Sequence, residues 1–226
     1  RLLLVTSLPE SFDTITELAR RYFANVEPLY WEMGNKQTRP QVYEQMEASN
    51  FTLIVSHFNG VIFKPHHLEQ ATFGAVNIHP SPPEHPGVWG LFCQPVIRRD
   101  IRTHHGMTLH EIDERIDHGP IYAVERWAVP ESASIEWVFE DVEEKNRVFL
   151  ESALDKLSKS ADGTRCFTPL DETWDINNAH HTIKDIQSWF RDLDPAHPAH
   201  QERIFFNHPK GQMEPPWFTD IEPELP

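Results

Sequence analysis

Asparagine and histidine stand two residues apart in the stretch Val-Asn-Ile-His-Pro-Ser at residues 76–81. The apolar approach to this stretch is typical of a strand, in which residues two apart project from the same face. Asn77 and His79 are therefore expected side by side, with Pro80 ending the strand. An amide and an imidazole presented together can polarise a carbonyl and handle a proton, as acyl transfer requires. An isolated Asn-x-His can equally be a strand end whose polar groups only satisfy local hydrogen bonds.

A carboxylate is available in the turn Ile-Asp-His-Gly-Pro at residues 116–120. Placed near His79, Asp117 would raise the basicity of the imidazole, orient its proton and draw a proton from a nucleophile through water. Taken alone, Asp117 is an ordinary turn residue. No serine or cysteine stands out as a nucleophile, so the pattern favours direct transfer without a covalent enzyme intermediate.

The composition of the 226 residues excludes some classes of protein. A formal net charge of −15 argues against a nucleic-acid surface, because phosphate binding needs clustered Lys and Arg. The chain is 39% hydrophobic and has no run of about 18 apolar residues, so we expect a globular cytoplasmic enzyme that does not bind a membrane.

Cysteines and histidines give little sign of a metal site or a disulfide. Cys93 and Cys166 lie outside any CxxC pair and are expected to be buried thiols in a reducing compartment. Histidine pairs occur at residues 66–67, 104–105 and 180–181. Adjacent side chains are not expected to point one way, and no His-x-x-x-His spacing occurs, so no metal is expected.

Short apolar runs alternate with amphipathic segments in the first half of the chain. Strands are expected at residues 2–6, 26–30, 51–56 and 75–79, with helices beginning at Ser11 and near Pro40. This order predicts an α/β fold with a doubly wound, mostly parallel sheet. Ligands of such sheets bind at the carboxyl ends of strands, so the loop at 58–62 is a candidate pocket wall, although its Asn-Gly is also usual in a plain turn.

The second half predicts further strands at residues 107–112 and 121–127 and a long amphipathic helix from Ser134. A helix at 91–99 carries a basic run that could receive a phosphate or form a solvated helix end: Arg98, Arg99 and Arg102. Polar residues at 158–164 mark a boundary between a catalytic domain at 1–160 and a C-terminal appendage at 161–226. The appendage is expected to hold a helix at 182–191 and a strand at 203–207. Three tryptophans there could stack on a substrate but are expected to pack on the core: Trp174, Trp189 and Trp217.

Three motifs in order resemble the formyltransferases that use 10-formyltetrahydrofolate: Asn-Ile-His-Pro-Ser at 77–81, Gly-Met-Thr-Leu-His at 106–110 and Asp-His-Gly-Pro-Ile at 117–121. The resemblance spans residues 2–159 and implies that family's Rossmann-like fold. It implies a catalytic set of Asn77, His79 and Asp117, and Thr108 and His110 match the strand before the Asp loop. It also implies folate binding by two loops through Phe58, Asn59, Gly60, Val61, Ile62, Ile112, Ile116 and Asp117.

Departures from the family concern the amine that accepts the formyl group. The loop at 82–90 differs from the usual one, and Ser81 and Trp89 are candidates for substrate binding. The turn at 7–10 lacks the Gly/Ser-rich phosphate loop of glycinamide ribonucleotide enzymes, and the acidic charge disfavours tRNA. The tail from residue 186 loosely resembles sugar-nucleotide N-formyltransferases. The expected function is therefore N-formyl transfer to a primary amine of a nucleotide-linked amino sugar.

Other functions stay open at this point. The acceptor could be another small amine, such as glycinamide ribonucleotide or an ornithine derivative. Water could replace the amine, which would make the protein a formyltetrahydrofolate hydrolase that releases formate. A protein that keeps the fold but only binds folate is the non-enzymatic alternative. A homodimer is compatible with the sequence, which does not determine the oligomeric state.

Overall fold

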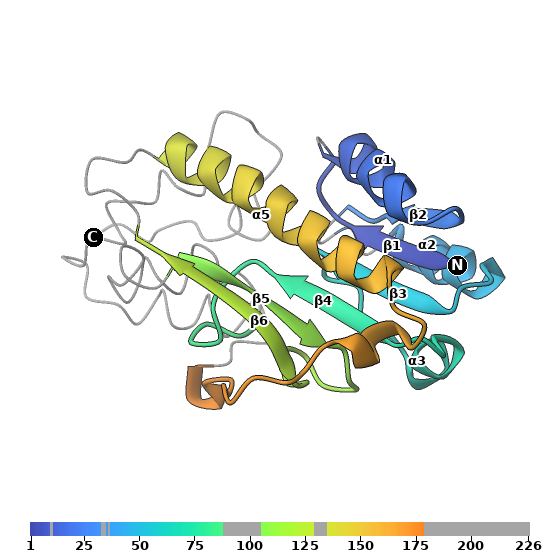
Figure 1. The fold of residues 1–226 in the computed structure, drawn as a ribbon. Helices are drawn as coiled ribbons and strands as arrows, with labels where there is room; N and C mark the ends of the chain where they lie inside the picture. The colour runs from blue at the N-terminus through green and yellow to red at the C-terminus, as the bar shows by residue number, and fades with distance from the viewer. Residues whose placement is uncertain (10, 33–34, 36, 88–104, 129–134, 179–226) are drawn as a thin grey trace, which may run out of the picture.

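A sheet of six strands in the order β2-β1-β3-β4-β5-β6 forms the centre of the computed structural model (Figure 1). The structure describes residues 1–9, 11–32, 35, 37–87, 105–128 and 135–178. The first four strands pair in parallel, and β5 and β6 join them antiparallel. The strands are β1 Leu2–Thr6, β2 Val26–Tyr30, β3 Leu53–His57, β4 Ala75–His79, β5 His105–Glu111 and β6 Ile121–Trp127.

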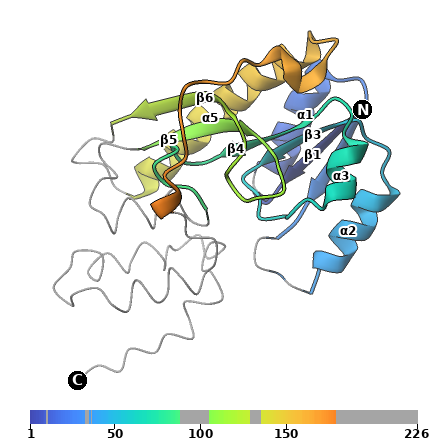
Figure 2. The ribbon, with the colours of Figure 1, turned by 90° about the horizontal axis from the view of Figure 1, so that it is seen from below.

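Helices cover both faces of this sheet (Figures 1 and 2). The helices α1 and α5 pack on one face, and α2 and α3 pack on the other. Their bounds are α1 Phe12–Tyr22, α2 Arg39–Ala48, α3 Pro65–Gln70 and α5 Ile135–Ser158. The predicted doubly wound, mostly parallel α/β fold is therefore confirmed. Within the described residues, no helix is long and apolar enough to cross a membrane.

Most element predictions agree with the structure. The strands expected at 2–6, 26–30, 75–79 and 121–127 have these bounds, while those expected at 51–56 and 107–112 are displaced by one or two residues. Helix α3 was not predicted, because its six residues contain no apolar repeat. Several expectations lie outside the described residues: the elements at 91–99, 182–191 and 203–207, and Trp89, Cys93, Arg98, Arg99, Arg102, Trp189 and Trp217.

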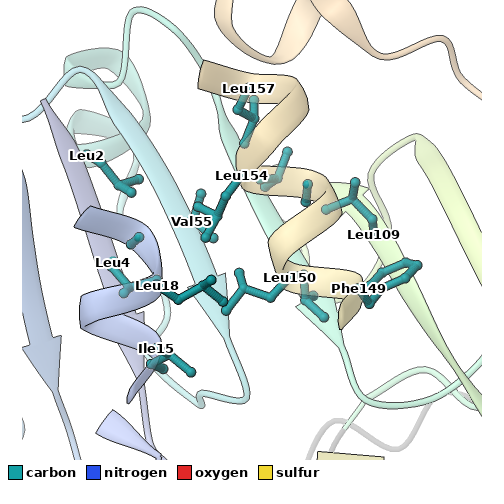
Figure 3. Packing of buried hydrophobic residues seen from close by; sticks show 14 of the residues in the cluster. Leu2, Leu4, Ile15, Leu18, Val55, Leu109, Phe149, Leu150, Leu154 and Leu157 are labelled. Carbon is teal, nitrogen blue, oxygen red and sulfur yellow. The ribbon is translucent and has the colours of Figure 1, made fainter. Parts of the chain in front are cut away.

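The larger hydrophobic core lies between the sheet and the helices α1 and α5 (Figure 3). Leu18 of α1 and Leu150 and Leu154 of α5 are buried there against Leu4 and Val55 of the sheet. Burial of each such side chain contributes roughly 1.5–3 kcal/mol. A second core on the opposite face buries the alternate residues of β1 and β3, which explains why both strands are continuous apolar runs.

The start of α1 is also tied to α5 by a polar contact. Ser11 occupies the N-cap position, as predicted, but its hydroxyl makes no capping bond. Instead, it donates to Glu143 Oε1 of α5 at 2.5 Å. The N-cap residue therefore contributes a bond between helices in place of a bond within one helix.

The chain after α5 contains two short 3-10 helices, η1 Gly163–Cys166 and η2 Ile176–Asn178, and it buries the side chains of Phe167 and Trp174. A Cβ at Gly163 would lie 2.0 Å from the carbonyl oxygen of Phe73, so only glycine fits this approach, at φ +61°. Cys166 is a free thiol. The division of the chain at residue 160 remains a prediction, and the described part of the appendage lies on the predicted catalytic domain.

His57 forms a buried polar network at the carboxyl end of β3, on the α5 side. Asn146 Nδ2 donates to His57 Nε2, and Thr6 Oγ1 lies 3.4 Å from His57 Nδ1, so the neutral imidazole satisfies partners on β1 and α5. Burial lowers the pKa of His57 to about 4, although the Asn146 bond opposes this shift. The folded protein therefore resists protonation of this side chain.

This network predicts a loss of stability in acid. The unfolded chain binds a proton at His57 near pH 6.5, which the folded protein does not bind until about pH 4, so stability falls as the pH falls through this window. Between pH 7 and pH 5 this single histidine should cost about 2 kcal/mol of unfolding free energy. His57→Gln should remove that share of the pH dependence in urea unfolding, whereas the exposed control His66→Gln should not. Equal pH dependence in H57Q and the wild type would contradict the assignment.

Candidate active site

Three neighbouring strands present polar side chains on the face opposite α5. The sheet register pairs Ser56 of β3 with Asn77 of β4, Asn77 with His110 of β5, and His79 with Thr108. Alternation along β4 turns Ile78 to the other face, into the core, as the sequence predicts. Asn77 Nδ2 lies 3.1 Å from His110 Nε2. The strand register alone therefore brings Asn77 and His79 next to His110, without a contribution from a loop.

Asp117 reaches these residues from the turn between β5 and β6. One carboxylate oxygen lies 3.5 Å from His79 Nδ1, and the other lies 3.4 Å from His110 Nε2. The backbone N–H of Gly87 donates to Asp117 Oδ2 at 2.7 Å. Asp117 has a left-handed backbone with φ +43°, and a Cβ at Gly119 would lie 2.1 Å from the Glu111 carbonyl oxygen. The Asp-His-Gly-Pro sequence is therefore what allows the turn to aim its carboxylate inward.

The Asp117 carboxylate is buried yet ionised. Its side chain is only 7% exposed, and burial alone would raise its pKa. The contacts with His79 and His110 and the bond from the Gly87 N–H outweigh burial and hold the pKa of Asp117 well below its ordinary value. The site therefore contains a fixed negative charge at neutral pH.

His79 is bound on both ring nitrogens. Its Nε2 lies 2.9 Å from the carbonyl oxygen of His85 and 2.6 Å from Ser81 Oγ, while Nδ1 faces Asp117. Burial lowers the pKa of His79, and the opposing effects of Asp117 and of the His85 carbonyl do not cancel it. Asp117 raises the pKa of this imidazole, as expected, but desolvation of the buried ring is the larger effect and leaves the pKa lowered overall.

Two further residues complete the walls of the site. Ser81 is fully buried and its hydroxyl donates to the His85 carbonyl at 2.7 Å, so it contacts His79 rather than an open surface. Trp174 packs its ring edge-on against His79 and His110 at 5.7 and 4.8 Å, and its Nε1 donates to the Gly119 carbonyl at 3.0 Å. The sequence favours packing of Trp174 on the core, with stacking on a substrate as the alternative, and no local pattern connects Trp174 to β4.

The two predicted donor loops flank this set. Phe58 is half-buried with φ +44°, Asn59 Oδ1 accepts from the Val61 N–H at 2.5 Å, and Gly60 is half-buried. Val61 is buried and Ile112 packs against the second core. Ile62 and Ile116 expose 44% and 38% of their surface, one on each loop. Exposed aliphatic side chains on both loops suit the flat face of a ring such as a pterin, whose polar groups lie at its edge.

A separate cluster on α2 and α3 resembles a metal site in its composition. Glu47 Oε1 lies 3.5 Å from His66 Nε2 and 3.9 Å from His67 Nε2, so the expectation that adjacent histidines cannot face one group is wrong for this pair. The Lys64 backbone N–H donates to His67 Nδ1 at 3.2 Å, so the neutral ring carries its proton on Nε2. His67 Nε2 therefore has no lone pair with which to bind a metal ion beside Glu47 in this conformation.

A cavity of about 330 Å³ lies at the carboxyl ends of β1 and β3, on the α5 side of the sheet. Its lining includes His57, Glu140, Glu143, Glu144 and Arg147. Three carboxylates beside one guanidinium make an unfavourable environment for a phosphate. This cavity and Asn77 lie on opposite faces of the sheet.

The mostly parallel sheet carries Asn77 and His79 on β4 with Asp117 beside them, an arrangement that suits an α/β transferase acting on a carbonyl group. The family model described as formyl transferase matches residues 15–154, and the chain belongs to this family. It is an enzyme that transfers formyl groups, and 10-formyltetrahydrofolate is the family's donor. The search of curated proteins found no match.

Solved structures share the fold at low sequence identity. Protein Rv3404c of Mycobacterium tuberculosis is 20% identical with a TM-score of 0.62, over 86% of this chain and 80% of that one. The formyltransferase PseJ of Anoxybacillus kamchatkensis, solved with UDP-4,6-dideoxy-4-formamido-L-AltNAc and tetrahydrofolate, is 16% identical with a TM-score of 0.58, over 87% and 93%. Phosphoribosylglycinamide formyltransferase of Bacillus halodurans is 18% identical with a TM-score of 0.55, over 71% and 97%.

The site geometry predicts how the pKa of His79 responds to Asp117. The carboxylate raises this pKa, so Asp117→Asn should lower it further while the Gly87 N–H keeps an oxygen to donate to. NMR titration of the histidine Cε1–H signals measures the shift. The exposed control Asp155→Asn, which loses only an ion pair with Lys159, should leave the pKa of His79 unchanged. A pKa that stays constant or rises in D117N would contradict the contact.

Proposed function

We propose that the protein transfers the formyl group of 10-formyltetrahydrofolate to the primary amine of a nucleotide-linked amino sugar, with Asn77, His79 and Asp117 as catalytic residues. The observation that carries the proposal is the cluster itself, in which a fixed carboxylate lies within 3.5 Å of His79 and His110, and His110 contacts the Asn77 amide. Such a cluster offers hydrogen-bond donors for a carbonyl oxygen beside a group that accepts a proton.

The proposed reaction uses these groups in one addition and one cleavage. The amine nitrogen attacks the formyl carbon, and the carbonyl oxygen gains negative charge. Asn77 Nδ2–H donates to that oxygen, and protonated His79 donates to it after one ring N–H leaves its protein partner. Asp117 accepts the amine proton through a water molecule; the carbonyl then re-forms as the bond from the formyl carbon to N10 of the folate breaks, and the same proton passes to N10. The low pKa of Asp117 keeps it in the required carboxylate form.

The amino-sugar acceptor is supported by similarity to PseJ, whose structure contains a UDP-linked formamido sugar and tetrahydrofolate. Phosphoribosylglycinamide formyltransferase shares the fold as well, so its acceptor is the second candidate. The acidic cavity at the end of β1 and the absence of a glycine-rich turn there disfavour a ribose phosphate at that place. A nucleotide-linked amino sugar is therefore the preferred acceptor.

Mass spectrometry of the reaction products tests this proposal. The wild-type protein would be incubated with 10-formyltetrahydrofolate and a panel of amines: nucleotide-linked 3- and 4-amino sugars, glycinamide ribonucleotide and ornithine derivatives. We expect one amino sugar to gain a single formyl group. Formyl transfer to glycinamide ribonucleotide or ornithine derivatives alone would overturn the acceptor class. Formate as the only product would indicate a hydrolase, and an intact bound donor would indicate a folate-binding protein.

Asp117→Asn tests the assigned proton acceptor in the same assay. We expect turnover to fall by about 100-fold or more, because an amide cannot take the amine proton. Folding should persist, since the Asn side chain still presents an oxygen to the Gly87 N–H. The control Asp155→Asn, a carboxylate of α5 that pairs with Lys159, should turn over at the wild-type rate. Near-normal turnover in D117N would exclude Asp117 from this role.

A further inference from the structure

We infer that Ser56 and Asn59 are positioning residues that hold the Asn77 amide with its NH₂ group toward the reacting carbonyl. This inference rests on the proposed function. The two residues lie at the end of β3 and in the loop that follows it, and neither contacts His79 or Asp117 in the described structure. Their effect reaches the chemistry through a directed chain of hydrogen bonds.

The series of hydrogen bonds begins at the backbone N–H of Val61, which can only donate. The Val61 N–H donates to Asn59 Oδ1 at 2.5 Å, which places the Asn59 NH₂ group on the other side of that amide. Asn59 Nδ2 then donates to Ser56 Oγ. Ser56 has a single hydroxyl hydrogen, which it donates to Asn77 Oδ1 at 2.7 Å. The Asn77 carbonyl is thereby occupied, and its NH₂ group must face away from β3.

At its other end, the series begins at the backbone carbonyl of Glu111, which can only accept. His110 Nδ1 lies 2.8 Å from the carbonyl oxygen of Glu111, so Nδ1 carries the ring proton. In the neutral ring, Nε2 then has a lone pair, which accepts from Asn77 Nδ2 at 3.1 Å. The two ends therefore assign the same orientation to the Asn77 amide independently.

Burial makes the opposite orientation costly. If the amide of Asn77 turned over, the Ser56 hydrogen would lose its acceptor, and the Asn77 oxygen would face the lone pair of His110. Ser56 and His110 are each only 3% exposed, so water cannot replace the lost bonds, and each buried group without a partner costs about 1–3 kcal/mol. In this orientation, one N–H of the Asn77 amide binds His110. The second N–H then points toward the place of the formyl oxygen.

The chain also couples the donor loop to the catalytic amide. Phe58 has the left-handed φ of +44°, and its carbonyl oxygen accepts from the Ser7 N–H at 3.1 Å, so the loop leaves β3 in a defined direction. That direction places Asn59 over Ser56. A loop that binds the folate in this conformation therefore preserves the hydrogen bond that orients Asn77.

Substitutions that change the direction of the hydrogen bonds without changing side-chain shape test the inference. In Asn59→Asp, one carboxylate oxygen keeps the Val61 N–H and the other takes the Ser56 hydrogen, so Ser56 no longer donates to Asn77. We expect kcat to fall about tenfold or more in N59D and in Ser56→Ala, with the KM for the donor within about twofold. Ser56→Thr keeps the hydroxyl and should recover most of the lost rate. The matched control Ser158→Ala removes a hydroxyl that donates only to the Asp155 carbonyl on α5 and should behave as wild type.

A readout that does not need catalysis distinguishes this inference from the proposed function. ¹⁵N NMR should show neutral His110 as the Nδ1–H form in the wild type and a shift toward the Nε2–H form in N59D, because the turned Asn77 oxygen then faces Nε2. If no amine is formylated by the wild type, the proposed function fails, and the His110 signal alone decides the positioning role. An unchanged His110 signal in N59D would overturn the inference. A wild-type kcat in both N59D and S56A would also overturn it.

Discussion

The site depends on keeping one negative charge away from water. Transfer of a carboxylate into a protein interior costs several kcal/mol even after the surroundings relax, so Asp117 must be compensated by groups close to it. Those groups come from three separate segments: His79 at the end of β4, His110 on β5 and the N–H of Gly87 in the loop between them. The buried charge therefore requires these segments to meet, and the same contacts bring the imidazole and amide to the place where a carbonyl can react.

The sheet supplies the precision that this compensation needs. Ser56, Asn77 and His110 occupy successive positions across β3, β4 and β5, so their side chains are cross-strand neighbours on one face. β4 is parallel to β3 and antiparallel to β5. The last residue of β4, His79, therefore pairs with Thr108 in the middle of β5. A site assembled on rigid strands requires only the Asp117 turn to be placed by a loop, and the left-handed backbone there is the local cost.

Local sequence patterns predicted the strands because their signals are strong. β1 and β3 each begin with an unbroken apolar run, and Asn77 and His79 interrupt β4 at the spacing of one face. The same patterns could not reveal Trp174, whose contacts with His79 and His110 join residues far apart in the sequence. They anticipated that Asp117 raises the pKa of His79 but not that burial lowers it more, since the extent of burial depends on every element packed around the ring.

Two adjacent residues at the end of β3 show how the fold separates stability from chemistry. His57 points toward α5 and joins Thr6 and Asn146 in a neutral buried network, while Ser56 points to the opposite face and orients Asn77. Because side chains alternate along a strand, a register slip of one residue would exchange these environments. An imidazole would then meet the Asn77 amide and a hydroxyl would meet Asn146. The burial of the apolar residues of β3 on both faces, which fixes the register, therefore also keeps Ser56 beside the Asn77 amide, in the contact on which the proposed orientation of that amide depends.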